Sequence, residues 1–63
     1  MEDYQNRVVE EKKELDIKID KLGSFLYGDK VNVVASEAIR MGKQLDVMKE
    51  YSVILADRIS NFK

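Results

Sequence analysis

Apolar residues recur at alternating intervals of three and four along the first 26 positions of the chain, which predicts an amphipathic α-helix. One row along that helix reads Tyr4, Val8, Glu11, Leu15, Lys18, Leu22 and Phe25. Glu11 and Lys18 interrupt this apolar row at places expected to face inward, whereas Gln5 is expected on the wetter side. Because burying a charge is costly unless it is paired or used, the row either meets a polar partner in another subunit or borders a ligand site.

The chain of 63 residues is expected to form one all-α domain, an antiparallel hairpin of two helices. The pattern predicts a first helix over about residues 3–26, a turn and loop over 27–35, and a second helix over about 36–61. Self-association of such hairpins would then give a homo-oligomeric helical bundle.

Local signals mark the connection between the two helices. Gly28, within Tyr27-Gly28-Asp29, can adopt the left-handed conformation that ends a helix. The β-branched segment from Lys30 to Ala35 is interpreted as a loop or a distorted helical lead-in, since it has no second strand to pair with. Ser36 is expected to cap the second helix. Gly42, inside that helix, marks either a close helix crossing or a kink beside a ligand.

The second helix carries more apolar surface than one partner helix can cover. Its first stripe, interrupted at Ser52, consists of Met41, Leu45, Met48, Leu55, Ile59 and Phe62, and a second stripe consists of Val47, Tyr51 and Ile54. An exposed contiguous apolar stripe usually marks a protein interface. We therefore expect an oligomer interface made by Val8, Leu15, Leu22, Phe25, Val47, Met48, Tyr51, Ile54 and Leu55.

Composition supports association and argues against several functions. The length lies below the roughly 70–80 residues at which one core usually stabilises a domain alone. Cys and His are both absent, so disulfides, thiolate nucleophiles and the usual zinc sites are excluded. No metal, cofactor or catalytic residue is expected, because acid–base histidines and Gly-rich phosphate loops are missing. Eleven basic against twelve acidic residues lack the footprint of a DNA or RNA binder.

The sequence also bears on where the protein resides. No apolar run approaches the roughly 18 residues of a membrane-spanning helix. The acidic start lacks the basic flank of a signal peptide. We therefore expect a cytoplasmic protein without a membrane partner.

Several side chains are of the types that bind small anionic ligands. Aromatic rings stack on bases, and Arg and Lys hold phosphates by charge-assisted hydrogen bonds. The candidates are Tyr4, Arg7, Lys18, Tyr51 and Arg58. The alternatives are interface packing for the tyrosines, salt bridges or solvation for the arginines, and pairing of Lys18 with Glu11 or Glu14. An antiparallel helix pair would bring Glu11 of one chain near Lys18 of another, which would set register.

Two stretches carry a resemblance to a known group of proteins. They are Tyr4-Gln5-x-Arg7-Val8-x-x-Glu11-Lys12-x-x-Leu15-Asp16-x-Lys18-Ile19-x-Lys21-Leu22-x-x-Phe25 and Gln44-Leu45-x-x-Met48-Lys49-x-Tyr51-x-x-x-Leu55-x-x-Arg58-Ile59-x-x-Phe62. The chain resembles a widespread group of very small phage proteins first catalogued in crAss-like phages. That group is similar to the phage anti-CBASS and anti-Thoeris sponges, which oligomerise and sequester cyclic-nucleotide signals without cleaving them.

The resemblance implies a non-enzymatic anti-defence sponge in the host cytoplasm, with a small cyclic nucleotide or ADP-ribose-type ligand held between subunits. Tyr4 would then stack on a base, Arg7, Lys18 and Arg58 would meet phosphates, and Glu11 would orient a cation or accept a hydrogen bond from a base edge. The alternative is a small homo-oligomeric protein whose second apolar stripe docks a host or phage polypeptide.

Overall fold

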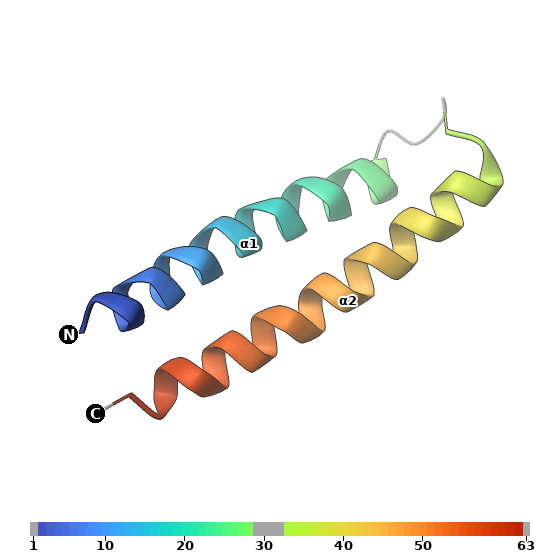
Figure 1. Ribbon diagram of the computed structural model, residues 1–63. Helices are drawn as coiled ribbons and strands as arrows, with labels where there is room; N and C mark the ends of the chain where they lie inside the picture. Colours follow the sequence, from blue (N-terminus) through green and yellow to red (C-terminus); the bar gives the residue numbers. More distant parts are fainter. Residues whose placement is uncertain (1, 29–32, 63) are drawn as a thin grey trace.

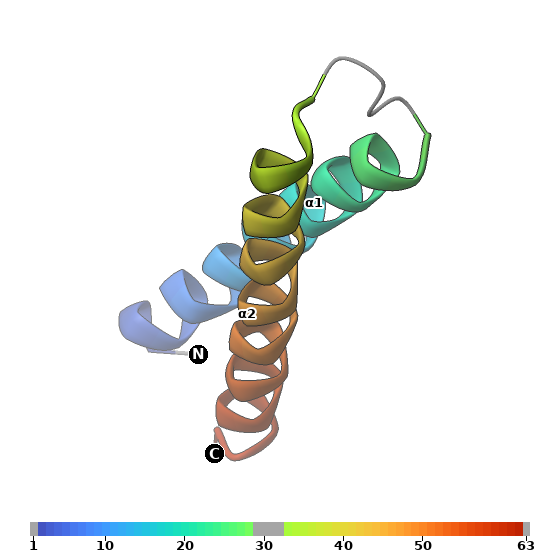
Figure 2. The same cartoon turned by 90° about the vertical axis from the view of Figure 1, so that its right-hand side faces the viewer.

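The computed structural model describes residues 2–28 and 33–62 and shows two helices packed as a hairpin (Figure 1). The first helix, α1, spans Asp3–Gly28, and the second, α2, spans Ala35–Ser60. Both chain ends lie at the same end of an elongated molecule with extents of 45 × 14 × 14 Å. Figure 2 shows that the helices cross obliquely. The all-α antiparallel hairpin predicted from the spacing of apolar residues is confirmed.

The beginning of α1 is held by a side chain that reaches back over its first turn. The Glu2 backbone N–H donates to the Gln5 Oε1 at 2.9 Å. This is the returning half of a capping box, in which the third helical residue satisfies the donor before the helix. Gln5 is consequently only 5% exposed, and the expectation that it lies on the wetter side is wrong.

The connection between the helices differs from the prediction at both of its ends. Helix α1 continues through Gly28, whose φ is not positive, so the expected left-handed ending is wrong. Helix α2 begins at Ala35, one residue before Ser36, and Val34 in an extended conformation occupies the cap position without a side-chain hydrogen bond. The predicted Ser36 cap is therefore also wrong, because Ser36 already lies inside the first turn, which the bond from the Ala38 N–H to the Val34 carbonyl closes at 3.0 Å.

Part of the predicted connection lies outside the described residues. This applies to Asp29 of the predicted turn and to Lys30, Val31 and Asn32 of the β-branched segment.

At the C-terminal end of α2, the Asn61 side chain donates to the Asp57 carbonyl at 2.8 Å and so satisfies one of the last carbonyls of the helix.

The two helices meet along a seam of buried and half-buried positions spaced alternately by three and four residues, as in a coiled coil. Leu55 at its centre is 0% exposed, and Val8, Leu15 and Leu45 are also buried. The seam consists of Gln5, Val8, Lys12, Leu15, Ile19, Leu22 and Leu26 of α1, of Ala38, Met41, Leu45, Met48, Ser52, Leu55 and Ile59 of α2, and of Phe62 just beyond the end of α2. The first apolar stripe predicted for the second helix is thus confirmed as the α2 side of the seam.

The α1 side of the seam is rotated relative to the predicted row. Val8, Leu15 and Leu22 belong to both, but Lys12 and the aliphatic Ile19 lie in the seam where Glu11 and Lys18 were expected. The expectation that Glu11 and Lys18 face inward is therefore wrong for the hairpin, since both are exposed. Helix α1 carries two apolar rows, and α2 packs against the row that contains fewer charged residues.

Two contacts and one close approach of the helices show the register of the hairpin. The ring of Tyr4 packs edge-on against Phe62 with centroids 5.7 Å apart, Asp16 accepts a hydrogen bond from Ser52, and a Cβ added at Gly23 would lie 3.9 Å from Leu45. The same register is therefore kept from the chain ends to the turn of α1 that carries Gly23.

Candidate functional site

The hairpin presents a different surface on each side of its seam. One side, here called the hollow flank, contains two adjoining open hollows of about 280 and 370 Å³ near the loop end. On α1 the hollows are lined by Ile19, Asp20, Gly23, Ser24, Leu26 and Tyr27, and on α2 by Ala38, Gly42, Leu45, Asp46 and Lys49. These lining residues show which sides of α1 and α2 lie together.

The opposite sides of the two helices must then also lie together. Residues seven apart are two helical turns apart and share a face. The side of α1 that carries Tyr4 therefore also carries Glu11, Lys18 and Phe25. We call the resulting surface the tyrosine flank. It consists of Tyr4, Arg7, Glu11, Lys18 and Phe25 of α1 and Val47, Tyr51, Ile54 and Arg58 of α2.

The five residues to which the resemblance gives a ligand role all lie exposed on the tyrosine flank, and they are Tyr4, Arg7, Glu11, Lys18 and Arg58. Since Asp16 is level with Ser52, Glu11 is level with the α2 turn that carries Arg58. Arg7 is one turn from Glu11, so these side chains share one half of the flank. Lys18 is fourteen residues from Tyr4, about 21 Å along the axis, so a single chain does not bring Lys18 together with Tyr4.

The residues predicted to form an oligomer interface divide into two groups. Val8, Leu15 and Leu55 are buried within the hairpin, and Leu22 and Met48 are half-buried beside them, so these five have little surface left to offer. The other four lie on the tyrosine flank, with exposed fractions of 37% for Phe25, 63% for Val47, 40% for Tyr51 and 57% for Ile54. The second apolar stripe of α2 is thus exposed in the hairpin, as its position in the sequence indicates.

A polar cluster interrupts the middle of the seam. The Ser52 hydroxyl donates to the Asp16 Oδ1 at 2.6 Å, and the Lys12 ammonium donates to the Asp16 Oδ2 at 2.7 Å. These two bonds, first that from Lys12 and then that from Ser52, lower the pKa of Asp16 below its ordinary value of 3.8. Ser52 is visible in the sequence as a break in an apolar stripe, but nothing in the sequence marks Asp16 as its partner.

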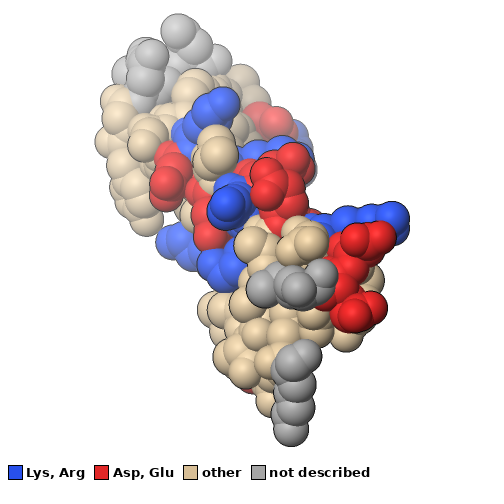
Figure 3. All heavy atoms as spheres, turned by 90° about the vertical axis from the view of Figure 1, so that its left-hand side faces the viewer, with Lys and Arg blue, Asp and Glu red and all other residues tan. Residues whose placement is uncertain are grey.

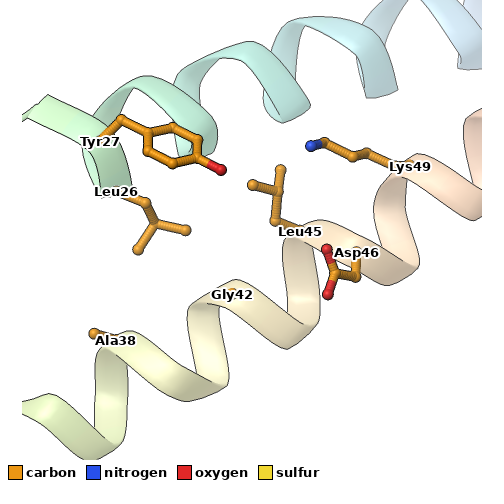
Figure 4. A pocket seen from close by; sticks show the side chains of 7 residues that line it. All are labelled: Leu26, Tyr27, Ala38, Gly42, Leu45, Asp46 and Lys49. Carbon is orange, nitrogen blue, oxygen red and sulfur yellow. The ribbon is translucent and has the colours of Figure 1, made fainter.

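The hollow flank was not predicted as a site. In Figure 4 the Tyr27 hydroxyl and the Lys49 ammonium point toward one another above Leu45. A Cβ at Gly42 would meet no heavy atom within 4 Å, so Gly42 does not mark a close helix crossing in the hairpin. Gly42 lines the hollow instead. The hollows are open, and none of the five predicted ligand residues lines them.

Charges of both signs are mixed over the surface. Viewed from the end that carries both termini, Figure 3 shows Lys and Arg interspersed with Asp and Glu, without a broad patch of either sign on this face. Within residues 2–28 and 33–62, no cluster of acidic side chains has the arrangement needed to hold a metal ion. Neither described helix is long and apolar enough to cross a membrane.

The fold and its exposed flank describe a very small two-helix protein with charged and apolar side chains exposed beside a single seam. More specifically, the chain belongs to the Sequestin family, whose sequence pattern matches residues 2–61. The match covers both helices and the connection between them. No curated protein and no solved structure matches the chain.

Proposed function

We propose that this protein is a non-enzymatic sponge of phage origin, which binds a cyclic-nucleotide-type immune signal between subunits and so withholds it from the host defence. Membership of a family named for sequestering supports the proposal at the level of the class of protein. The observation that carries it further is the gathering of Tyr4, Arg7, Glu11, Lys18 and Arg58 on one exposed flank.

Each of these side chains has a chemical role on that flank. Tyr4 is 56% exposed, so part of its ring remains available to stack on a base while it also packs against Phe62 with the two ring planes 76° apart. Arg7, Lys18 and Arg58 supply charge-assisted hydrogen bonds to phosphates. Glu11 accepts from a base edge or orients a bound cation. A sponge needs affinity and an excess of protein, and it needs no stabilisation of a transition state.

Calorimetric titration with a panel of cyclic di- and trinucleotides and cyclic ADP-ribose isomers tests the proposal. We expect at least one member to bind tightly, and Tyr4→Ala and Lys18→Ala to weaken that binding at least tenfold. The matched controls are Tyr27→Ala and Lys49→Ala, which change exposed residues of the same types on the hollow flank. Equal losses in the controls, or no binding by any compound, would contradict the proposal.

The exposed apolar stripe of Val47, Tyr51 and Ile54 favours one other function, the docking of a host or phage polypeptide. In that case substitution of Tyr51 or Ile54 abolishes capture of the polypeptide, and Tyr4→Ala and Lys18→Ala have almost no effect. The two functions therefore predict opposite results for the same four variants.

A further inference from the structure

On the side of α1 that faces away from the hollows, the residue types are complementary to the same residue types read in the opposite direction. Its side chains follow at intervals of seven as an aromatic residue, an acid, a base and an aromatic residue, which are Tyr4, Glu11, Lys18 and Phe25. If a second α1 runs antiparallel across this side with the axis between Glu14 and Leu15, each acid meets a base and each aromatic ring meets another. Glu11 then faces Lys18 of the second copy, and Tyr4 faces its Phe25.

Helix α2 independently indicates the same axis. Asp16 is level with Ser52, which places the centre of the α1 row close to residue 53 of α2. The midpoint of Tyr51 and Ile54 lies within about one residue of that level along the helix axis, which is about 1.5 Å. The axis that pairs acid with base on α1 therefore also sets Tyr51 against Ile54 of the second copy. These two side chains are 40% and 57% exposed in the hairpin and would cover one another.

We propose that two hairpins pair through their tyrosine flanks around a two-fold axis perpendicular to the helices. Helix α1 then packs antiparallel on α1 and α2 antiparallel on α2, in a four-helix bundle. The pairing creates two equivalent shared sites, each with Tyr4 and Arg7 of one chain beside Lys18 and Phe25 of the other. The ligand assignment of these sites rests on the proposed function, but the pairing does not.

The pairing removes the main geometric difficulty of the ligand site. Within one chain Tyr4 and Lys18 are about 21 Å apart along the axis. In the paired arrangement Tyr4 is level with Phe25 of the second copy, so its axial distance from that copy's Lys18 falls to about 10 Å, and Arg7 approaches the same Lys18 to about 6 Å. A nucleotide whose base inserts between Tyr4 and the second copy's Phe25 can reach this Lys18 and Arg7 with its phosphates. Lys18 has three donors and can meet both Glu11 and a phosphate.

The hairpin's small core supports a second copy as the occupant of the flank. Among the described residues only Val8, Leu15, Leu45 and Leu55 are buried apolar side chains, which is little for a domain of this length. The complementary charges favour an identical chain over an unrelated one, because a two-fold interface must complement itself. Glu14 lies near the axis and would face its own copy from the solvated rim.

Disulfide trapping tests the pairing without any ligand. The chain contains no cysteine, so a single introduced thiol reports one proximity. We expect Glu14→Cys to form disulfide-linked dimers under mild oxidation, because the axis passes beside this residue. The matched control is Lys13→Cys, at the neighbouring exposed position, which lies on the hollow flank because Asp20, seven residues further on, lines a hollow. If Glu14→Cys stays monomeric, or if Lys13→Cys is linked equally well, the proposed pairing is overturned.

Complementation between two inactive variants tests the shared site. Tyr4→Ala and Lys18→Ala each spoil both sites of a homodimer, but a mixed dimer keeps one site with Tyr4 from one chain and Lys18 from the other. After unfolding and refolding an equal mixture, we expect about a quarter of the wild-type binding capacity for the tightest compound of the nucleotide panel. No recovery overturns the shared site. Full binding by each variant alone overturns the proposed function, and the disulfide result for Glu14→Cys decides the pairing in either case.

Discussion

Truncating Ile54 to alanine should weaken self-association, and Val53 provides a control at the neighbouring position. Both are β-branched residues of α2, and in the hairpin Ile54 is 57% and Val53 68% exposed. Replacement by alanine changes helix propensity by a similar small amount at both. Val53, however, lies on the outer side toward the hollow flank, whereas Ile54 lies on the tyrosine flank. Ile54 and Val53 are therefore similar in exposure and helix propensity in the isolated hairpin, and only Ile54 would be buried by a second copy.

The size of the effect follows from the exposed fraction. Fully burying an Ile side chain stabilises by about 1.5–3 kcal/mol, so covering the exposed 57% of Ile54 contributes roughly 1 kcal/mol beyond what alanine retains. Two copies meet in a dimer, which gives about 2 kcal/mol and a roughly 30-fold rise in the dissociation constant for Ile54→Ala. Val53→Ala should change stability by less than about 0.5 kcal/mol.

Sedimentation at a series of concentrations measures the dissociation constant, and thermal unfolding over the same series should give a melting temperature that rises with concentration. Equal dissociation constants for Ile54→Ala and Val53→Ala would refute the reasoning. So would a melting temperature that is independent of concentration in the unsubstituted protein.

Three other substitutions test separate parts of the structure. Leu55→Ala, at the fully buried centre of the seam, should cost about 2–5 kcal/mol of the roughly 3–9 kcal/mol expected for a chain of this length, and chemical denaturation would show a loss of most of its stability. Asp16→Asn should remove a pH dependence. The lowered pKa of Asp16 contributes stability that is present above the ordinary value of 3.8 and is lost as the pH falls through the still lower folded value. The melting temperatures of the two proteins should therefore converge in strong acid and separate toward neutral pH. Parallel curves of melting temperature against pH would contradict this. Gly42→Ala should raise the melting temperature by favouring the helix, since the added Cβ meets nothing within 4 Å, and a fall would show that this face is covered by another molecule.

The hairpin and the α2 side of its seam were predictable because a long apolar stripe at helical spacing has few alternatives. The choice of seam on α1 was not predictable in the same way, because Val8, Leu15 and Leu22 belong to two overlapping rows. Only the packing of α2 decides between the row with Glu11 and Lys18 and the row with Lys12 and Ile19. Local spacing carries no information about that choice.

The candidate site shows the same division. Tyr4, Arg7, Lys18 and Arg58 were identified by side-chain chemistry, and the resemblance added Glu11. A rotation of α1 moves its residues as one set, so all five lie on one exposed flank. The Asp16–Ser52 hydrogen bond was missed because it joins residues 36 positions apart. Gln5 was placed on the wrong side because its burial depends on a hydrogen bond to the backbone of Glu2, which polarity alone does not reveal.

The central claim, that the protein holds a nucleotide without consuming it, is tested most directly by recovering the ligand after binding. The protein would be saturated with the tightest compound of the cyclic-nucleotide panel, freed of excess, denatured by heat, and the released material analysed by mass spectrometry. The account predicts that the same compound is recovered intact, at one molecule per chain. Recovery of a cleaved product would contradict the claim of a sponge, and the absence of any retained nucleotide would contradict the claim of sequestration.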